Sequence, residues 1–90
     1  MSASATLDGD LDFARVPRLL DGADALVAAG TLDLSGVRRA DSAGLALLLE
    51  LSRRARARGI ELRLRGANEQ VAGLARFFGL DKVLRYDDSA

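Results

Sequence analysis

The chain has 90 residues, 49% of them hydrophobic and 29% charged, and its 13 basic and 13 acidic side chains give a formal net charge of zero. This length suits one domain, and the balanced charge does not point to nucleic acid or an anionic membrane as the main partner. Cys and His do not occur in the sequence, which excludes disulfides, thiol chemistry and imidazole-based metal or proton-transfer sites. We expect one domain over residues 1–90, with no metal and no cofactor.

Nothing in the sequence predicts a targeting or membrane-spanning segment. The first five residues, Met-Ser-Ala-Ser-Ala, lack the basic and apolar regions of a signal peptide. The longest apolar stretch, residues 45–51, is interrupted by Glu50 and is far shorter than the ~20 residues of a membrane helix. We therefore expect a cytoplasmic protein.

The first third of the chain predicts a strand followed by a helix. Residues 3–7 predict the strand, and the Asp-Gly-Asp sequence at 8–10 predicts a turn after it. The helix is expected to start near residue 15 or 16, because Pro17 is tolerated only in a first turn, and to end at Gly30. Its apolar face comprises Phe13, Val16, Leu19, Leu20, Ala23, Leu26 and Val27.

The middle of the chain predicts two strands around a long helix. Residues 31–34 alternate as a short strand does, and residues 35–40 are expected to form a loop. A helix should run over residues 42–58 and close at Gly59. Residues 60–65 alternate strictly between apolar and charged side chains, which predicts the clearest strand of the chain.

The last part predicts a third helix and a short final strand. Asn68 is a good N-cap, Gly79 is the expected helix stop, and residues 83–86 can form the strand. Phe77 lies off the main apolar face and is interpreted as peripheral core rather than as an interface anchor. The buried face is expected to comprise Val71, Leu74, Ala75 and Phe78.

Strands that alternate with helices predict an α/β fold. Crossover connections of this kind produce a mixed, mostly parallel sheet, here of about four strands with about three helices. The alternation within the predicted strands indicates that one face of the sheet is much better covered than the other.

The start of the second predicted helix has unusual local chemistry. Asp41 or Ser42 can cap it, and its free amides would favour an anion. Gly44 lowers helix propensity by up to about 1 kcal/mol relative to Ala, so it is useful there if something approaches the backbone closely. The simpler interpretation is that Asp41 and Ser42 only cap the helix.

A projection of this helix separates a core face from an exposed stripe. Leu45, Leu48, Leu51, Ser52 and Ala55 form the predicted core face. The opposite stripe begins with small residues, which leave room for a partner to dock, and ends with charged ones. It comprises Ser42, Ala46, Glu50, Arg53 and Ala57, with Ala43 and Arg54 beside it.

Four arginines gather near the end of this helix, at positions 53, 54, 56 and 58. They fit a solvated face that complements the helix dipole. Contact with an acidic surface of a partner is the alternative.

Three segments together resemble a STAS domain, the family of sulphate-transporter domains and anti-sigma-factor antagonists. They are Asp-Leu-Ser-Gly-Val at 33–37, Asp-Ser-Ala-Gly-Leu-Ala-Leu-Leu at 41–48 and Gly-Leu-Asp-Lys-Val-Leu at 79–84. The resemblance covers about residues 6–86 and implies a STAS-like fold. Members often begin with a two-stranded hairpin, whereas this chain is predicted to start at the second strand.

The sub-type follows from the residue before the motif glycine. In the antagonists the phosphorylated Ser or Thr stands there, but here the position is Ala43 and the hydroxyl comes one residue earlier, at Ser42. This order is instead similar to the MlaB-like branch of the family, small cytoplasmic subunits of a phospholipid ABC transporter. In that branch the hydroxyl residue at the position of Ser42 lies at the contact with the transporter's ATPase.

The resemblance implies a non-catalytic adaptor that binds this ATPase, supports its activity and reaches the inner membrane only through its complex. The alternative is an anti-sigma-factor antagonist regulated by phosphorylation, with Ser42 as a possible acceptor; Ala43 argues against it. The residues implied at the contact are Asp41, Ser42, Ala43, Gly44, Ala46, Glu50 and Arg53.

Two further classes of function fit less well. A nucleotide or small-ligand binder would be expected to carry a glycine-rich phosphate loop, and the single lysine, Lys82, is far along the sequence from Asp41. An enzyme fits least, because no base or oxyanion residues are predicted beside Asp41 and Ser42.

Overall fold

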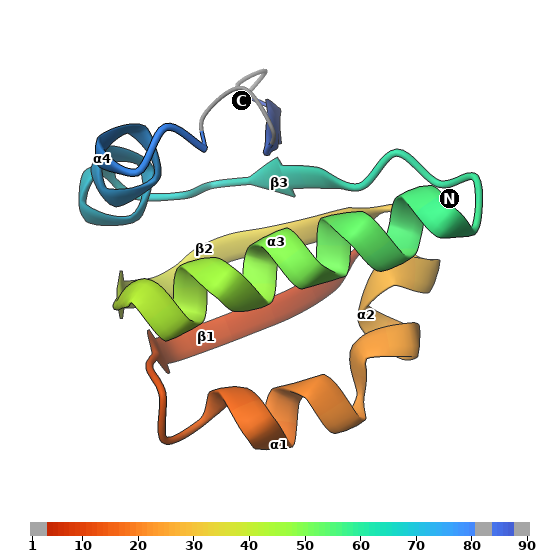
Figure 1. Ribbon diagram of the computed structural model, residues 1–90, viewed down its shortest axis with the longest axis horizontal. Helices are drawn as coiled ribbons and strands as arrows, with labels where there is room; N and C mark the ends of the chain where they lie inside the picture. Colours follow the sequence, from red (N-terminus) through yellow and green to blue (C-terminus); the bar gives the residue numbers. More distant parts are fainter. Residues whose placement is uncertain (1–3, 81–83, 88–90) are drawn as a thin grey trace.

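The computed structural model describes residues 4–80 and 84–87, in which strands and helices alternate (Figure 1). The four described strands lie in one sheet in the order β1-β2-β3-β4, and each neighbouring pair is parallel. The α/β class and the mostly parallel sheet are confirmed. The elements are β1 (Ala5–Leu11), α1 (Val16–Asp21), α2 (Ala23–Ala28), β2 (Thr31–Ala40), α3 (Ser42–Ala57), β3 (Arg63–Arg65), α4 (Glu69–Phe77) and β4 (Arg85–Asp87).

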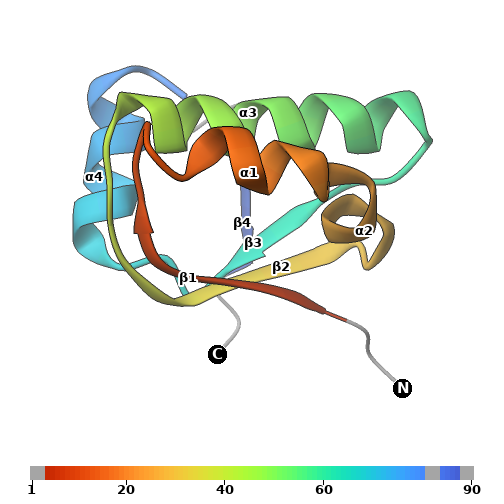
Figure 2. The same cartoon turned by 90° about the horizontal axis from the view of Figure 1, so that it is seen from below.

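The helices lie on one side of the sheet, and α3 runs along it with α1 and α2 beside it (Figure 2). This follows from the strand order, because right-handed crossovers between consecutive parallel neighbours fall on the same face. Leu32, Leu34 and Leu64 point to that face and are fully buried, whereas Arg63 and Arg65 on the opposite face are exposed. The prediction of one well-covered face and one open face is therefore confirmed.

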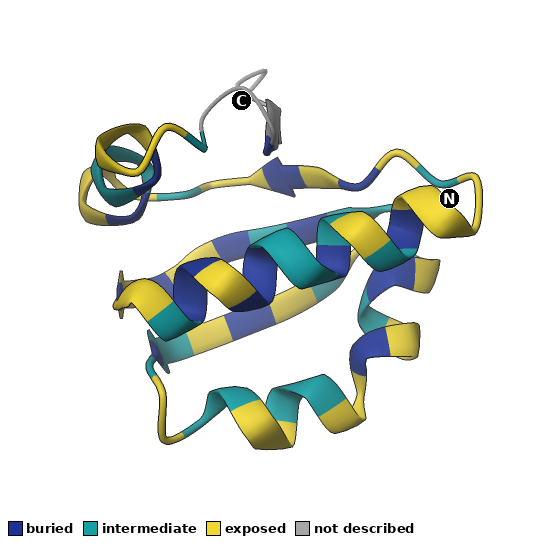
Figure 3. Ribbon diagram, viewed as in Figure 1, coloured by how far each residue is buried: buried dark blue, intermediate teal, exposed yellow. Residues whose placement is uncertain are grey.

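The hydrophobic core fills the layer between the sheet and the helices, where buried positions of α3 face those of β1 and β2 (Figure 3). It contains leucines from strands and helix alike, which close-pack with small residues such as Ala23 and Ala55. Its largest fully buried side chains are Leu11, Leu32, Leu34, Leu47, Leu48, Leu51, Leu64, Val27 and Val71.

Strands β1 and β2 are longer than predicted. The turn expected at residues 8–10 and the loop expected at residues 35–40 are both wrong, because these two segments pair with each other from Asp8–Gly36 to Leu11–Ala40. The pairing shifts register twice, and Gly9, with a φ of 71°, lies at the second shift. The glycine that suggested a turn therefore belongs to an irregularity within a continuous strand.

Arg15 covers the outer edge of β1. Its Nη1 donates to the carbonyl oxygens of Asp8 at 2.5 Å and Asp10 at 2.8 Å. A Cβ on Gly9 would lie 2.9 Å from the same nitrogen, so the glycine also makes room for the guanidinium. The irregular strand and the arginine thus form one local arrangement at the end of the sheet.

The first predicted helix is divided into α1 and α2 at Gly22, whose backbone leaves the helical conformation with φ −102° and ψ 18°. Its predicted start is confirmed, since Pro17 lies in the first turn of α1. The predicted burial of Phe13 is wrong: Phe13 precedes α1 and is 76% exposed.

The C-terminal elements agree with their predicted positions more closely than with their predicted lengths. Only Arg63–Arg65 pairs as β3, although Ile60 and Leu62 still pack against the core. The side chain of Asn68 accepts from the amide of Val71 at 3.0 Å, which confirms the predicted cap of α4. In the final strand, residue 83 lies outside the described residues, and pairing runs over Arg85–Asp87.

Candidate functional site

The first turn of α3 is closed by Asp41. Its Oδ1 accepts from the amide of Gly44 at 3.0 Å and its Oδ2 from the amide of Phe13 at 3.2 Å. The hydrogen bond from Gly44, supported by that from Phe13, holds the pKa of Asp41 below its ordinary value. The cap is confirmed, and the anion beside these amides is the chain's own carboxylate.

Gly44 lies against strand β1, not at the surface. A Cβ at this position would be 2.1 Å from the carbonyl oxygen of Leu11, so no larger residue fits without moving the helix. The close approach expected at Gly44 is therefore real, but the approaching group is the chain's own Leu11. Gly44 is buried and sets the depth at which α3 lies. Its role in binding a partner stays a prediction.

The outer face of α3 is exposed along most of the predicted stripe. Ser42, Ala46 and Arg53 are exposed, whereas Ala43 and Glu50 are half-buried. Within the described part of the chain, Ser42 has no hydrogen-bonded base that could activate its hydroxyl. Whether the stripe binds a partner stays a prediction, but its residues are placed where a partner could reach them.

The inner face of α3 differs from the prediction at two positions. Leu45, Leu48, Leu51 and Ala55 are buried as predicted, and Leu47 joins them. Ser52 is only half-buried, and its Oγ is buried without a hydrogen-bond partner among the described residues. Ser52 therefore belongs to the flank of the helix.

Glu50 organises the charged end of the stripe. Its carboxylate accepts from Arg53 at 2.8 and 2.9 Å and from Arg54 at 2.7 Å. These hydrogen bonds, first from Arg53 and then from Arg54, lower the pKa of Glu50 to about 2. One carboxylate thus holds two guanidinium groups against the helix surface.

An apolar hollow of about 260 Å³ opens beside the start of the stripe. Phe78 is 52% exposed at this hollow, although the sequence predicted it on the buried face of α4. Phe77 is 82% exposed, so its assignment to peripheral core is also wrong; the two rings meet edge to face at 5.3 Å. The lining residues are Ser42, Leu45, Ala46, Leu49, Phe78 and Leu80.

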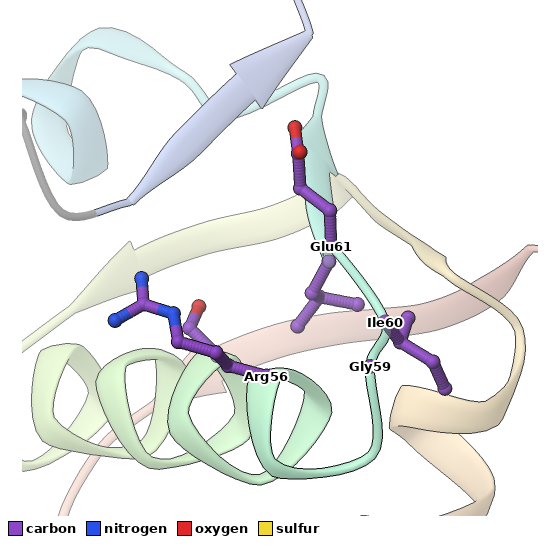
Figure 4. A pocket seen from close by; sticks show the side chains of 6 residues that line it. Arg56, Gly59, Ile60 and Glu61 are labelled. Atoms are coloured by element: carbon purple, nitrogen blue, oxygen red, sulfur yellow. The ribbon is translucent and has the colours of Figure 1, made fainter.

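Two further hollows continue along the same flank of α3. The middle one, of about 350 Å³, adjoins Ala46, Leu49, Ser52 and Arg56. The last one, of about 240 Å³, lies between the end of α3 and the chain leading into β3, and Figure 4 shows Arg56 extending along it while Glu61 points away. The sequence did not predict these hollows, because a linear pattern does not show how the flank of α3 lies against Leu80 or against the chain that turns back after Gly59.

The exposed phenylalanines were missed for a related reason. Phe13, Phe77 and Phe78 lie before or at the end of a helix, where helical periodicity no longer tells which way a side chain points. Phe13 also donates its amide to Asp41, which places it next to the start of α3.

Among residues 4–80 and 84–87, no acidic cluster could hold a metal ion, and no helix is long and apolar enough to cross a membrane.

A family model described as "Mlab, STAS domain" matches residues 3–86. The chain is 45% identical over 49 residues to the intermembrane phospholipid transport system binding protein MlaB of Escherichia coli (strain K12), and equally to that of Shigella flexneri. The match covers 54% of this chain and 50% of each relative, so the chain spans about half the length of the curated relatives it matches.

Two solved structures share the fold. A protein from Thermotoga maritima described as an anti-sigma factor antagonist superimposes with a TM-score of 0.75 at 20% identity, covering 93% of this chain and 79% of that one. The anti-sigma factor antagonist SpoIIAA in its unphosphorylated form gives 0.71 at 21% identity, covering 99% and 85%. At such identity the likeness establishes the STAS-like fold alone.

Proposed function

Because the chain belongs to the STAS-domain family of the MlaB type, we propose that it is a non-catalytic adaptor that binds the ATPase subunit of an ABC-type phospholipid transporter. The relatives named MlaB are binding proteins of an intermembrane phospholipid transport system. In this role the chain supports the activity of the ATPase from the cytoplasm and reaches the inner membrane only through the complex.

The observation that supports this proposal most is the exposed start of α3. Ser42 and Ala46 present small side chains to solvent, and an apolar hollow lies directly beside them. The helix beneath them is fixed by the Asp41 cap and by the contact of Gly44 with Leu11. A rigid, small-residue surface next to an apolar hollow suits the close docking of another protein, because little entropy is lost when it binds.

The decisive experiment replaces Ala46 by Arg and measures binding of the purified domain to the ATPase subunit. Arg keeps good helix propensity, so the free domain should change in stability by no more than about 0.5 kcal/mol. At a packed contact the same side chain should weaken binding by more than about tenfold, or about 1.4 kcal/mol. Ala25→Arg, at an exposed position of α2, is the matched control and should bind normally.

Three outcomes would contradict this proposal. Undiminished binding by Ala46→Arg would place the contact elsewhere, and a collapsed melting curve of the free variant would mean that the stripe is part of the core. Phosphate on Ser42, detected by intact-mass measurement after incubation with an anti-sigma-factor kinase and ATP, would favour the antagonist function instead.

A further inference from the structure

The hollows along α3 share lining residues and therefore form one groove. The apolar hollow and the middle one share Ala46, Leu49 and Leu80, and the middle and last ones share Ser52 and Arg56. Since α3 has 16 residues, the groove follows about 24 Å of helix. We call it the α3 groove.

The two ends of the α3 groove differ in chemistry. Around Phe78 its lining is apolar except for the hydroxyl of Ser42. Toward the end of α3 it is bordered by Arg53 and Arg56. An occupant must therefore be apolar at one end and polar at the other.

The polar end carries an excess of positive charge. Arg53 and Arg54 share the single carboxylate of Glu50, and Arg56 forms no ion pair with any described residue. Three guanidinium groups against one carboxylate leave two positive charges on a chain whose formal net charge is zero. Glu61, which also adjoins the last hollow, points away from Arg56 and pairs with Arg63 instead.

A second polar group at this end also lacks a partner. The Oγ of Ser52 is buried without a hydrogen bond among the described residues, and Ser52 lines both hollows that Arg56 lines. A buried polar group without a partner is costly, and a rotation of the Ser52 side chain that brought its hydroxyl to an acceptor in the groove would relieve that cost.

We propose that the α3 groove receives a segment of the ATPase subunit that carries apolar side chains at the Phe78 end and carboxylates at the Arg56 end. This inference rests on the proposed function and specifies the chemistry of the partner. A carboxylate would meet the unpaired guanidinium of Arg56, and the apolar part would cover the exposed ring of Phe78. The charge excess sets the direction in which the segment lies along α3.

The test compares Arg56→Glu with Arg39→Glu in binding to the purified ATPase subunit at low and high salt. Arg39 is exposed on β2 and lines none of the three hollows, so Arg39→Glu makes the same charge change outside the groove lining. We expect Arg56→Glu to weaken binding by at least about tenfold and Arg39→Glu to leave it nearly unchanged. Arg56→Gln, which only removes the charge, should weaken binding less and flatten its salt dependence.

The outcomes separate this inference from the proposed function. If Ala46→Arg abolishes binding while Arg56→Glu binds as the unchanged chain does, the groove proposal is overturned and the adaptor function stands. If the unchanged chain does not bind the ATPase, both fall. Flotation with phosphatidylglycerol vesicles is the second arm of the test. If the chain binds these vesicles and Arg56→Glu does not, the basic end of the groove contacts a lipid surface, and the proposal that a protein segment occupies the groove is overturned.

Discussion

At Gly44, helix α3 approaches strand β1 so closely that only a hydrogen atom fits between them. The carbonyl of Leu11 occupies the space where a side chain would begin, and the same strand end receives a hydrogen bond from the amide of Asp41 at 3.1 Å. Depth and direction of the helix are thus fixed at its first turn. The exposed residues beside it owe their position to this contact.

Replacing Gly44 by Ala should destabilise the domain by about 1–3 kcal/mol or more, because the new methyl group would overlap the Leu11 carbonyl. Gly73→Ala is the matched control: a Cβ there meets only Arg76 at 3.6 Å and Glu69 at 3.9 Å within helix α4. The control should gain up to about 1 kcal/mol from helix propensity. Urea unfolding of both variants measures the change in stability. Equal changes for Gly44→Ala and Gly73→Ala would contradict the close contact between Gly44 and the Leu11 carbonyl.

The cluster around Glu50 predicts a pH dependence. Hydrogen bonds from Arg53 and Arg54 lower the pKa of Glu50 from 4.5 to about 2 in the folded chain. A carboxyl with a lowered folded-state pKa adds stability above its unfolded pKa, and that stability is lost as pH falls through the window between the two values.

The thermal midpoints of the unchanged chain and of Glu50→Gln should therefore differ at neutral pH and converge as pH falls from about 4.5 toward about 2. Because the cluster is partly exposed to solvent, the difference should be small and should shrink in high salt. A difference that stays constant across this window would show that Glu50 acts through packing and not through charge.

Helix α3 has two faces with separate tasks. Its inner face supplies Leu48 and Leu51 to the core, and its outer face and flank form the stripe and the α3 groove. Since both faces belong to one rigid element, the packing of the inner face sets the position of the outer one.

Leu48→Ala should cost about 2–5 kcal/mol, because it leaves a cavity in a fully buried position. For a domain whose total stability is about 5–10 kcal/mol, this is a severe loss. Leu49→Ala, next to it but only half-buried at the groove, should cost less. Equal melting temperatures for the two variants would mean that the helix is rotated from the described position.

Elements with local signals were predicted well, and elements that depend on distant partners were not. Helices α3 and α4 carry their own caps, Asp41 and Asn68, so their starts could be located from the sequence. The second half of β2 could not, because Gly36–Ala40 is extended only by pairing with β1. For the site, the helical period separated Ala46 from Leu48, but it could not show that Leu11 approaches Gly44 or that Phe78 borders a groove.

As a whole, the molecule places its proposed interaction surfaces on the helical side of the sheet. The opposite face is polar and bears charges of both signs, among them Asp33, Arg63 and Arg65. Asp33 accepts from the amide of Ser35, which with the nearby charge of Arg65 lowers its pKa. The distribution of apolar and charged groups thus leaves the helical side as the one suited to close docking.

The guanidinium of Arg15 affects whether a second copy of the chain could add a strand to the sheet at the β1 edge. A β-sheet grows when a new strand finds free carbonyl oxygens at its border, and at β1 the carbonyls of Asp8 and Asp10 are already engaged by Arg15. Open-ended growth from this border would first have to displace that side chain. The edge at β1 is therefore a poor place for a strand from another copy of the chain to add to the sheet.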